Sequence, residues 1–517
     1  MIDAEEGPEE GWTPLDRRTV AVTAVLITGA AAGAGIPAII GIAAGRSVGF
    51  ALAWVLPAAA ALVVSGALYD EVRWRRTRYR IGPSRVDLQT GLLVRTRRSL
   101  PLDRVRSVDI TAGPLLRAFG LVVVRIGTGQ HGGTGERTLE LRPVEREEGD
   151  RLRTVLLDRV RSAGGCSAEA ADGRLAWLDP RWVRFAPLSF ATPLLGVAAV
   201  VALLQIADRF GLQNSQLTEV VQVLDGLPLV AVGVLLAVVV LLVGVLGSLG
   251  LFAEMWWNYR LDREPGGTLR VRRGLLTTRS ISLEECRLRG VELVEPLGGR
   301  LAGAARVDAV TTGLTSGKDD RTTEHTTLLP AAPRPLAHRV AAVVLGEPVS
   351  PTASVRLAAH PPAARQRRLR WALAAVAVPV LVLAALGLLV TDVLLMPAGI
   401  VAVLAGPVAV VLALDAYRNL GHGITGGYLV MRSGTIRRRT VALQRNGIIG
   451  LTAKQSIFQR RSGLITITAT TAAGAGAFSA YDVDASAGLR FAEEAVPDLL
   501  GPFLECDGSA PLLARRV

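Results

Sequence analysis

Six long apolar blocks, arranged in three close pairs, constrain this chain more than any other feature of its sequence. A helix needs about 20 residues to cross roughly 30 Å of hydrocarbon. Each block is that long, and none has an Asp, Glu, Lys or Arg in its interior. A buried helix of a large soluble protein can also be apolar on all sides, but six blocks in tight pairs favour membrane spans. The expected spans are Thr19–Ala44, Val48–Tyr69, Ala186–Ile206, Leu227–Ala253, Trp371–Val390 and Val393–Leu414.

The positions of the arginines predict how these spans are oriented. The formal net charge is +13, and nearly all of the positive charge is Arg. Arginines precede the first, third and fifth blocks and follow the second, fourth and sixth, whereas the turns within each pair hold few. Positively charged flanks stay on the cytoplasmic side of a membrane. We therefore expect a multi-pass membrane protein, with both termini and every large segment in the cytoplasm.

Small residues recur at four-residue spacing in the first span, at Gly29 and Gly33 and again at Gly41 and Gly45. This spacing can let two membrane helices approach closely. The high Ala and Gly content of the chain accounts for it equally well, so the two interpretations stay open.

The segment after each pair of blocks repeats the same order of features. Short runs of Val, Ile, Leu and Thr alternate with polar residues and are joined by Gly turns, which indicates antiparallel strands with one buried face. In all three segments a turn glycine and a later glycine are 29 residues apart. These pairs are Gly91 and Gly120, Gly274 and Gly303, and Gly434 and Gly463.

A helical pattern closes each repeat, at Val144–Arg161, Pro335–Leu345 and Ala487–Leu500. Strands followed by one helix predict a small β-barrel, or two packed sheets with the helix over an open end. The expected fold is an α+β membrane protein with six transmembrane helices in three hairpins and three cytoplasmic β domains. The expected divisions are a tail (1–18), hairpin 1 (19–69), β domain 1 (70–165), a linker (166–185), hairpin 2 (186–253), β domain 2 (254–348), a linker (349–370), hairpin 3 (371–414), and β domain 3 with the C-terminal tail (415–517).

The first repeat carries a family resemblance. Two apolar blocks are followed by Tyr-Arg-Ile (79–81), a strand–Gly–Leu-Leu hairpin (86–94), Arg-Arg-Ser-Leu-Pro-Leu-Asp-Arg-Val (97–105) and Pro-Leu-Leu-Arg-Ala-Phe-Gly-Leu (114–121). This order resembles the second class of bacterial pleckstrin-homology-like (PH-like) domains, a membrane-flanked family of unknown function. The resemblance is weaker in the second repeat and weakest in the third, which lacks the Pro-Leu element.

The resemblance implies a seven-stranded PH-like barrel capped by a C-terminal helix in each repeat. Some membrane-bound relatives are associated with resistance to antimicrobial peptides at the cell envelope. The resemblance therefore also implies a role in envelope stress or antimicrobial resistance, but no defined activity.

The sequence contains no recognisable catalytic motif. The segment 313–319 resembles a phosphate loop, but its glycine spacing is one residue short and Asp319 occupies the Ser/Thr position. Cys166, Cys286 and Cys506 are too widely spaced for a zinc site or a disulfide framework. We predict no catalytic, cofactor-binding or metal-binding residues and no enzymatic activity. Five histidines are expected in loops or near domain edges, outside metal-ligand spacing: His131, His325, His338, His360 and His422.

A cluster of arginines after the second span is the candidate contact with anionic lipid. Charges this close to a headgroup layer are worth roughly 1 kcal/mol each. Membrane topology alone explains the same charges and is the simpler interpretation. Because the cluster abuts the membrane and lacks interleaved aromatic residues, we do not expect nucleic-acid binding. The cluster consists of Arg73, Arg75, Arg76, Arg78 and Arg80.

These features favour a non-enzymatic, membrane-anchored scaffold. Its PH-like domains are expected to contact one another, a protein partner or membrane lipids through loops and sheet edges. The alternative is a component of a transport or export system. Transport sites usually need polar or ionisable groups at mid-membrane, and the spans offer only Gln205 near one end and scattered Ser and Thr. A membrane enzyme of unrecognised type is a third hypothesis.

Overall fold

The computed structural model describes residues 12–82, 85–91, 96–102, 105, 107–127, 138–164, 173–189, 191–209, 228–312 and 326–497. The chain forms two compact units, Met1–Arg287 and Leu288–Val517. The boundary between them falls inside the second repeat.

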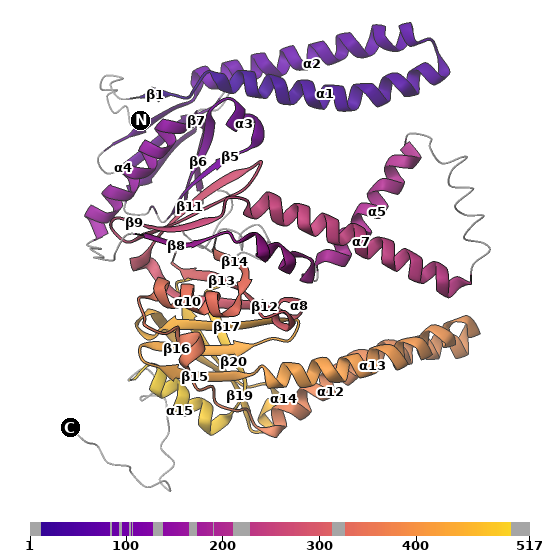
Figure 1. Cartoon of the computed structure of the whole chain (residues 1–517), viewed down its shortest axis with the longest axis vertical. Coiled ribbons are helices and arrows are strands. Elements are labelled where there is room, and N and C mark those ends of the chain that lie inside the picture. The colour runs from indigo at the N-terminus through magenta and orange to yellow at the C-terminus, as the bar shows by residue number, and fades with distance from the viewer. Residues whose placement is uncertain are drawn as a thin grey trace, which may run out of the picture. The chain divides into compact units, whose positions relative to one another are not determined.

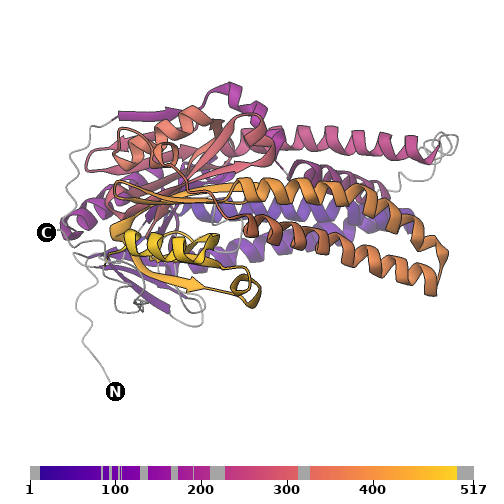
Figure 2. The same ribbon diagram turned by 90° about the horizontal axis from the view of Figure 1, so that it is seen from below.

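Long apolar helices form three contacting pairs; the helices of the first and third pairs run side by side, whereas those of the second pair cross (Figures 1 and 2). Within the described residues, five helices are long and apolar enough to cross a membrane, and at most 6 % of the residues in each of their apolar windows are buried within the protein. Their outward side chains, such as Leu389 and Val230, therefore need an apolar solvent. The pairs are α1 (Arg18–Gly45) with α2 (Val48–Arg76), α5 (Ala191–Arg209) with α7 (Leu229–Trp256), and α12 (Pro362–Leu389) with α13 (Leu395–Arg418).

The third expected span, Ala186–Ile206, does not form one straight helix. The 3₁₀ helix η2 (Pro180–Leu188) meets α5 at a bend of 77°, and the two together make the sixth possible span. Proline at positions 187 and 193 removes backbone donors and disfavours continuous helix at the preceding residues. The side chains of Trp182 and Phe185 are buried, so η2 packs against the protein.

The first unit contains two antiparallel sheets. Four strands form the first, in the order β1-β2-β3-β4, and seven form the second, in the order β7-β6-β5-β11-β10-β9-β8. The strands are β1 (Thr13–Pro14), β2 (Arg78–Ile81), β3 (Arg85–Thr90), β4 (Thr96–Pro101), β5 (Ser107–Ala112), β6 (Leu121–Gly127), β7 (Thr138–Glu145), β8 (Gly173–Trp177), β9 (Arg260–Glu264), β10 (Thr268–Arg273) and β11 (Thr278–Glu284). Helices α3 (Pro114–Ala118) and α4 (Arg146–Gly164) belong to the first repeat.

The second unit contains a six-stranded sheet, in the order β14-β13-β12-β17-β16-β15, and a three-stranded sheet, β18-β19-β20. The strands are β12 (Leu288–Pro296), β13 (Ala304–Thr311), β14 (Thr327–Pro333), β15 (Gly421–Thr425), β16 (Tyr428–Ser433), β17 (Arg437–Gln444), β18 (Ile448–Lys454), β19 (Leu464–Thr471) and β20 (Ala477–Asp484). The short helices are α8 (Leu297–Leu301), α10 (Arg334–Leu345), α11 (Pro351–Ser354), α14 (Ile457–Arg460) and α15 (Ala485–Ala495).

Two of these sheets join strands from successive repeats. In the first unit, β5 of the first repeat pairs with β11 of the second, with Ile110 opposite Ser280. In the second unit, β12 of the second repeat pairs with β17 of the third, from Gly290 opposite Leu443 to Pro296 opposite Arg437. Each repeat thus contributes three strands to one sheet and three to another before its closing helix. The sequence pattern predicts strands, but it does not reveal this pairing between repeats.

At the base of every helix pair, a residue or strand before the first helix forms backbone hydrogen bonds with one after the second helix. Thr13, before α1, pairs with Tyr79, after α2. Strand β8, before α5, pairs with β9, after α7. Ala358, before α12, forms a bridge with His422, after α13. The chain therefore enters and leaves each helix pair at the same place.

The six repeat glycines all have positive φ, the backbone region that side chains disfavour. The later glycine of each pair follows the short helix α3, α8 or α14, and the turn glycine precedes a hairpin strand. The third repeat lacks the Pro-Leu element, yet α14 still forms there because Ser456 and Gln459 make a capping box. The φ angles of the six repeat glycines are 139° at Gly91, 114° at Gly274, 102° at Gly434, 71° at Gly120, 71° at Gly303 and 63° at Gly463.

The closing helices lie close to their sheets because each has a small residue at its fourth position. A Cβ on Gly149 of α4 would lie 2.6 Å from Val122, and one on Gly488 of α15 would lie 2.8 Å from Ile465. Ala337 of α10 is fully buried at the equivalent place. Leu152 and Leu156 complete the core below α4. The helices begin within two residues of the predicted starts, and the predicted end of the third, at Leu500, lies outside the described residues.

The glycines at four-residue spacing in α1 do not mediate helix packing within this chain. Gly29, Gly33, Gly41 and Gly45 have no atom within 4 Å of an added Cβ in the described structure. Close approach occurs instead between α5 and α7, where a Cβ on Gly196 would lie 1.9 Å from the carbonyl oxygen of Val240.

The pairing between repeats can be tested with two matched glycines. A Cβ on Gly290 of β12 would lie 2.1 Å from the carbonyl oxygen of Ala442, whereas Gly450, the equivalent residue of β18, faces open space. We expect Gly290→Ala to lower the thermal unfolding temperature of the full-length protein in detergent, because β12 and β17 must separate. Gly450→Ala should change it little. Equal effects of the two substitutions would contradict this pairing.

Candidate functional site

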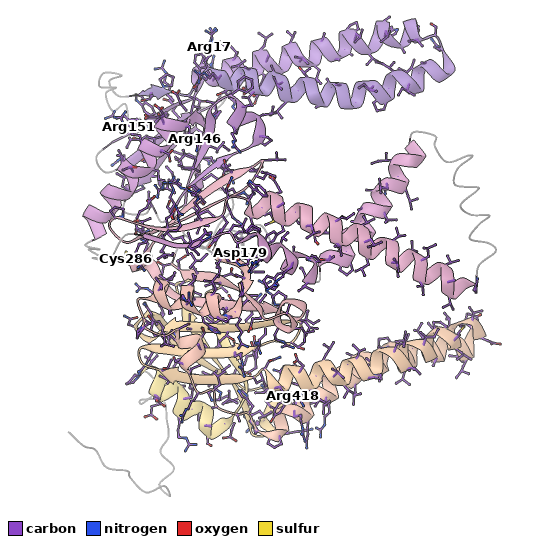
Figure 3. The ribbon with its side chains drawn as sticks, in the orientation of Figure 1. Arg17, Arg146, Arg151, Asp179, Cys286 and Arg418 are labelled. Atoms are coloured by element: carbon purple, nitrogen blue, oxygen red, sulfur yellow. The ribbon has the colours of Figure 1, made fainter. Side chains whose placement is uncertain are left out.

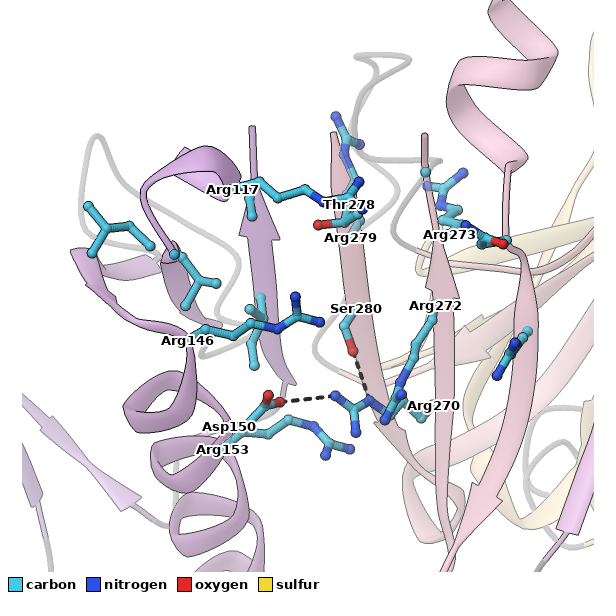
Figure 4. Close-up of a pocket in the computed structure, with 18 of the residues that line it drawn as sticks. Arg117, Arg146, Asp150, Arg153, Arg270, Arg272, Arg273, Thr278, Arg279 and Ser280 are labelled. Carbon is cyan, nitrogen blue, oxygen red and sulfur yellow. Dashed lines mark hydrogen bonds and ion pairs between the residues drawn. The ribbon is translucent and has the colours of Figure 1, made fainter. Parts of the chain in front are cut away.

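An arginine-rich cavity of about 460 Å³ lies in the first unit, between α3 and α4 on one side and strands β10 and β11 on the other (Figure 4). Its described lining includes one carboxylate, Asp150, and the hydroxyls of Thr154, Thr278 and Ser280. Eight arginines line it: Arg117, Arg146, Arg153, Arg260, Arg270, Arg272, Arg273 and Arg279.

Regular spacing brings these side chains together. On α4, Arg146, Asp150 and Arg153 are separated by four and three residues, which places them on one helix face. On β10, Arg270 and Arg272 are two residues apart and therefore share a face of the sheet. That face belongs to the sheet that β5 and β11 join, so the cavity contains residues from two repeats.

The floor of the cavity is an electrically balanced network. The guanidinium of Arg153 donates to Ser282 (2.7 Å) and to Glu264 (2.6 Å), and only 4 % of Arg153 is exposed. Arg270 donates to Ser280 (2.9 Å), to the other oxygen of Glu264 (3.0 Å) and to Asp150 (3.2 Å). Burial raises the pKa of Glu264, but the hydrogen bonds and charges of Arg153 and Arg270 outweigh it and lower the pKa overall.

The rim of the cavity is cationic, and the carboxylates of Glu264, Asp262 and Asp150 offset part of the charge of Arg272. The side chains of Arg146, Arg260 and Arg272 are exposed, and among the described residues they make no hydrogen bond or ion pair. Burial of its inner part, and then the charge of Arg270, lower the pKa of Arg272. Arg117 donates to the carbonyl of Leu275 at 2.9 Å, which holds α3 against the β10–β11 turn.

The cavity lies directly beside the end of an apolar helix. The carboxylate of Glu254, in the last turns of α7, accepts hydrogen bonds from the backbone N–H groups of Leu276 (3.0 Å) and Thr277 (2.9 Å). This contact fixes the β10–β11 turn to the helix. Arg273 stacks over the ring of Trp256, 4.3 Å from its centroid, at the last residue of α7. An aromatic residue and an arginine at a helix end are typical of a membrane interface.

The arginine cluster predicted from the sequence lies elsewhere. Arg73, Arg75 and Arg76 are in the last turn of α2, and Arg78 and Arg80 are in β2; all five are exposed. Within the cluster, Arg75 pairs with Glu71 at 2.9 Å. None of the five lines the cavity. Sequence reasoning missed the cavity arginines because they are distributed over α3, α4, β9, β10 and β11, although their helical and alternating spacing was visible.

His360 and His422 form a buried pair, whereas the sequence predicts loop or domain-edge positions for both. His422 lies in β15 and His360 just before α12; the exposed fractions are 4 % and 7 %. His360 Nδ1 is 3.0 Å from the backbone oxygen of Asp482, which can only accept a hydrogen bond. In the neutral pair His360 Nε2 therefore accepts from His422 Nδ1, 3.2 Å away. Phe491 packs edge-on against His422.

His338 lies in α10, 3.0 Å from the hydroxyl of Thr352, and Cys286 is exposed next to β11. Within the described part of the chain, no group of three His, Cys, Asp or Glu residues is positioned to hold a metal ion. The other predicted positions lie outside the described residues: His131, His325, Cys166, Cys506 and 313–319.

The histidine pair predicts a pH effect on stability. Burial, followed by the charge of His360, lowers the pKa of His422 to about 4, and burial lowers that of His360. Below about pH 6.5 the unfolded chain takes up protons that the folded pair does not. Stability should therefore fall as the pH drops from 6.5 towards 4 and be unaffected by this pair above 6.5. His422→Asn should flatten the dependence of unfolding temperature on pH; superimposable profiles for the two proteins would contradict the assignment.

Comparisons with known proteins agree with this architecture. A family model described as bacterial PH domain matches residues 23–160 and 369–495, about half of the chain. Each match spans one helix pair and the β segment after it. The second repeat lies outside both matches, so the sequence-based ranking of the third repeat as the weakest was wrong. The search of solved structures gave no significant match.

Two proteins of Bacillus subtilis (strain 168) are similar to parts of the chain. UPF0699 transmembrane protein YdbS is 36 % identical over 91 residues, which are 18 % of this chain and 54 % of that protein. UPF0699 transmembrane protein YdbT is 30 % identical over 88 residues, 17 % of each chain. The alignment thus spans about half of the first relative and about a sixth of the second. On the family match, this chain is a membrane protein that belongs to the bacterial PH domain family.

Proposed function

We propose that this protein is a non-enzymatic, membrane-anchored scaffold. In this proposal six transmembrane helices form three hairpins in a bacterial cell membrane and carry three cytoplasmic PH-like domains. The observation that carries the proposal is the pairing of strands from successive repeats, β5 with β11 and β12 with β17. A chain that uses its sheet edges to link successive repeats forms joined β domains, which suits a role in holding partners.

The β12–β17 pairing forms a seam between the second and third repeats, and buried ion pairs stabilise it. Glu295 of β12 is 1 % exposed and lies directly opposite Arg438 of β17. The two side chains make two hydrogen bonds, each 2.7 Å long. A bidentate pair of this kind fixes strand register as well as adding energy. Arg300 of α8 and Asp415 of α13 form a further contact between these repeats, at 2.8 Å.

The seam in the first unit has a comparable set of contacts. Arg287, which follows β11, donates to the carbonyl oxygen of Val105 at 2.6 Å. Arg153 of the first repeat binds Glu264 of the second at 2.6 Å. Asp109 of β5 lies at this seam, and burial raises its pKa to about 7 against the opposing charges of Arg125 and Arg279.

The cytoplasmic placement rests on the pairing at the base of each helix pair and on the charges found there. Both ends of a pair that is closed by strands lie on one side of the membrane. Arginines gather at these ends, as Arg17 at the start of α1 and Arg418 at the end of α13 illustrate (Figure 3). Positive flanks favour the cytoplasmic side.

The joined β domains are expected to hold protein partners or further copies of the chain beneath the membrane, alongside lipid contacts. A role in envelope stress or antimicrobial resistance is part of the same proposal. Crosslinking in intact membranes, followed by purification of the full-length protein, tests it. Crosslinked species larger than one chain, which diminish when Gly290→Ala weakens the β12–β17 seam, would support a scaffold. Recovery of the monomer alone would count against it.

The seam predicts non-additive stability losses. Arg438→Ala leaves Glu295 buried without its main partner and should cost about 3–5 kcal/mol of unfolding free energy. The double variant Glu295→Ala/Arg438→Ala should lose less than the sum of the two single losses, because each single variant already breaks the pair. Arg75→Ala, which breaks the exposed pair with Glu71, should cost no more than about 0.5 kcal/mol. Additive losses at the seam would argue against the pairing.

The orientation can be tested with the exposed Cys286. In a variant that keeps only this cysteine, a membrane-impermeant maleimide should label it in opened membranes and leave it unlabelled in intact spheroplasts. A cysteine placed at Asp392, in the turn between α12 and α13, should instead be labelled in intact spheroplasts. Labelling of Cys286 before the membrane is opened would reverse the proposed orientation.

A further inference from the structure

The arginine cavity of the first unit has the properties of a binding site for an anion. Its floor is already balanced, since Arg153 and Arg270 are paired with Glu264 and Asp150. The side chains of the rim arginines Arg146, Arg260 and Arg272 form no hydrogen bond or ion pair within the described residues. The carboxylates of Glu264, Asp262 and Asp150 offset part of the charge of Arg272, but eight arginines line the cavity. Bringing like charges together on a concave surface is unfavourable unless a counter-charge binds there. The charge pattern therefore points to an anionic ligand.

Membrane topology alone does not explain this arrangement. Positive-inside charges need only lie near a helix end, as those of α2 do. Here they converge from α4, β9 and β10 onto one cavity, and Glu264 holds the inner guanidinium groups in place. Such a preorganised set suits the recognition of an oxyanion, because each guanidinium can donate two parallel hydrogen bonds.

Size and position narrow the ligand further. A cavity of about 460 Å³ falls within the range of small-molecule sites and is larger than a bare phosphate needs. The hydroxyls of Thr278 and Ser280 line it beside the arginines and can bond to a polyol. Glu254 fixes the β10–β11 turn to the end of α7, so the cavity lies where this apolar helix would leave the hydrocarbon and meet the headgroup layer. These features fit a phosphate ester with a small hydroxylated substituent.

We propose that this cavity binds a phosphate monoester or diester, either as the headgroup of an anionic phospholipid or as a soluble metabolite of the same chemistry. Arg146 and Arg272 bind the phosphate, Arg260 adds attraction at the rim, and Thr278 and Ser280 contact the polar substituent. The site is separate from the exposed Arg73–Arg80 cluster, and it depends on the β5–β11 pairing because its walls come from two repeats.

The test uses the full-length protein with two kinds of probe. In nanodiscs of phosphatidylcholine alone, binding of sn-glycerol 3-phosphate is measured by titration. In nanodiscs in which phosphatidylglycerol replaces part of the phosphatidylcholine, retained lipid is counted by native mass spectrometry. The rim variant is Arg146→Gln/Arg272→Gln, both exposed residues whose removal should leave the fold intact. The matched control, Arg370→Gln/Arg418→Gln, removes the same charge from two exposed residues near the membrane that lie outside both the cavity and the Arg73–Arg80 cluster.

We expect the rim variant to weaken binding about tenfold or more, since each lost charge-assisted hydrogen bond has an effect of that order. The control should stay within about twofold of the unmodified protein. Binding of glycerol 3-phosphate would identify a soluble ligand, and retention of phosphatidylglycerol alone would identify a lipid headgroup; either supports the proposal. No binding of either probe, or equal losses in the rim variant and the control, would overturn it. Unfolding temperatures of both variants exclude loss of the fold as the cause.

Discussion

Backbone pairing at the base of each apolar helix pair is the constraint on which the rest of the structure depends. The contacts β1–β2, β8–β9 and Ala358 with His422 return the chain to its starting point after each excursion. With lipid around the helices, the backbone groups within the spans must be satisfied inside the helices themselves. The strands therefore begin where each helix pair ends, and the next helix pair begins after them. Strand edges of successive repeats can then pair with one another.

Those edges are used for pairing between repeats. An exposed strand edge is a site for unwanted association, and β5 and β12 avoid it by pairing with β11 and β17. Gly290 allows the backbones to approach at one seam, and the Glu295–Arg438 pair fixes its register. The β5–β11 pairing creates the arginine cavity in the first unit, because α4 of the first repeat then faces β10 of the second. The structural seam and the proposed ligand site are consequences of one arrangement.

Buried polar groups in the third repeat serve a different purpose. Asp482, 1 % exposed, pairs with Arg367 and with Arg368 at 3.4 Å, both in the first turns of α12. Its backbone, at φ 57°, lies in a β-bulge that turns the carboxylate towards the helix. The His360–His422 pair adjoins it through the Asp482 carbonyl. This network joins the apolar helix to the strand β20. Because burial lowers the pKa of both histidines, the junction is expected to weaken in acid.

The sequence by itself determined the apolar helices, the strand-rich repeats, the glycine turns and the closing helices. These features are local: span length, 3.6- and 2-residue periodicity and positive φ are properties of neighbouring residues. Only the tertiary structure decided which edges pair, where the third span bends, and that Arg146, Arg270 and Arg272 share a cavity while Arg73–Arg80 do not. Strand pairing and clustering bring together residues more than a hundred positions apart, and their free energies depend on packing and desolvation that no local pattern records.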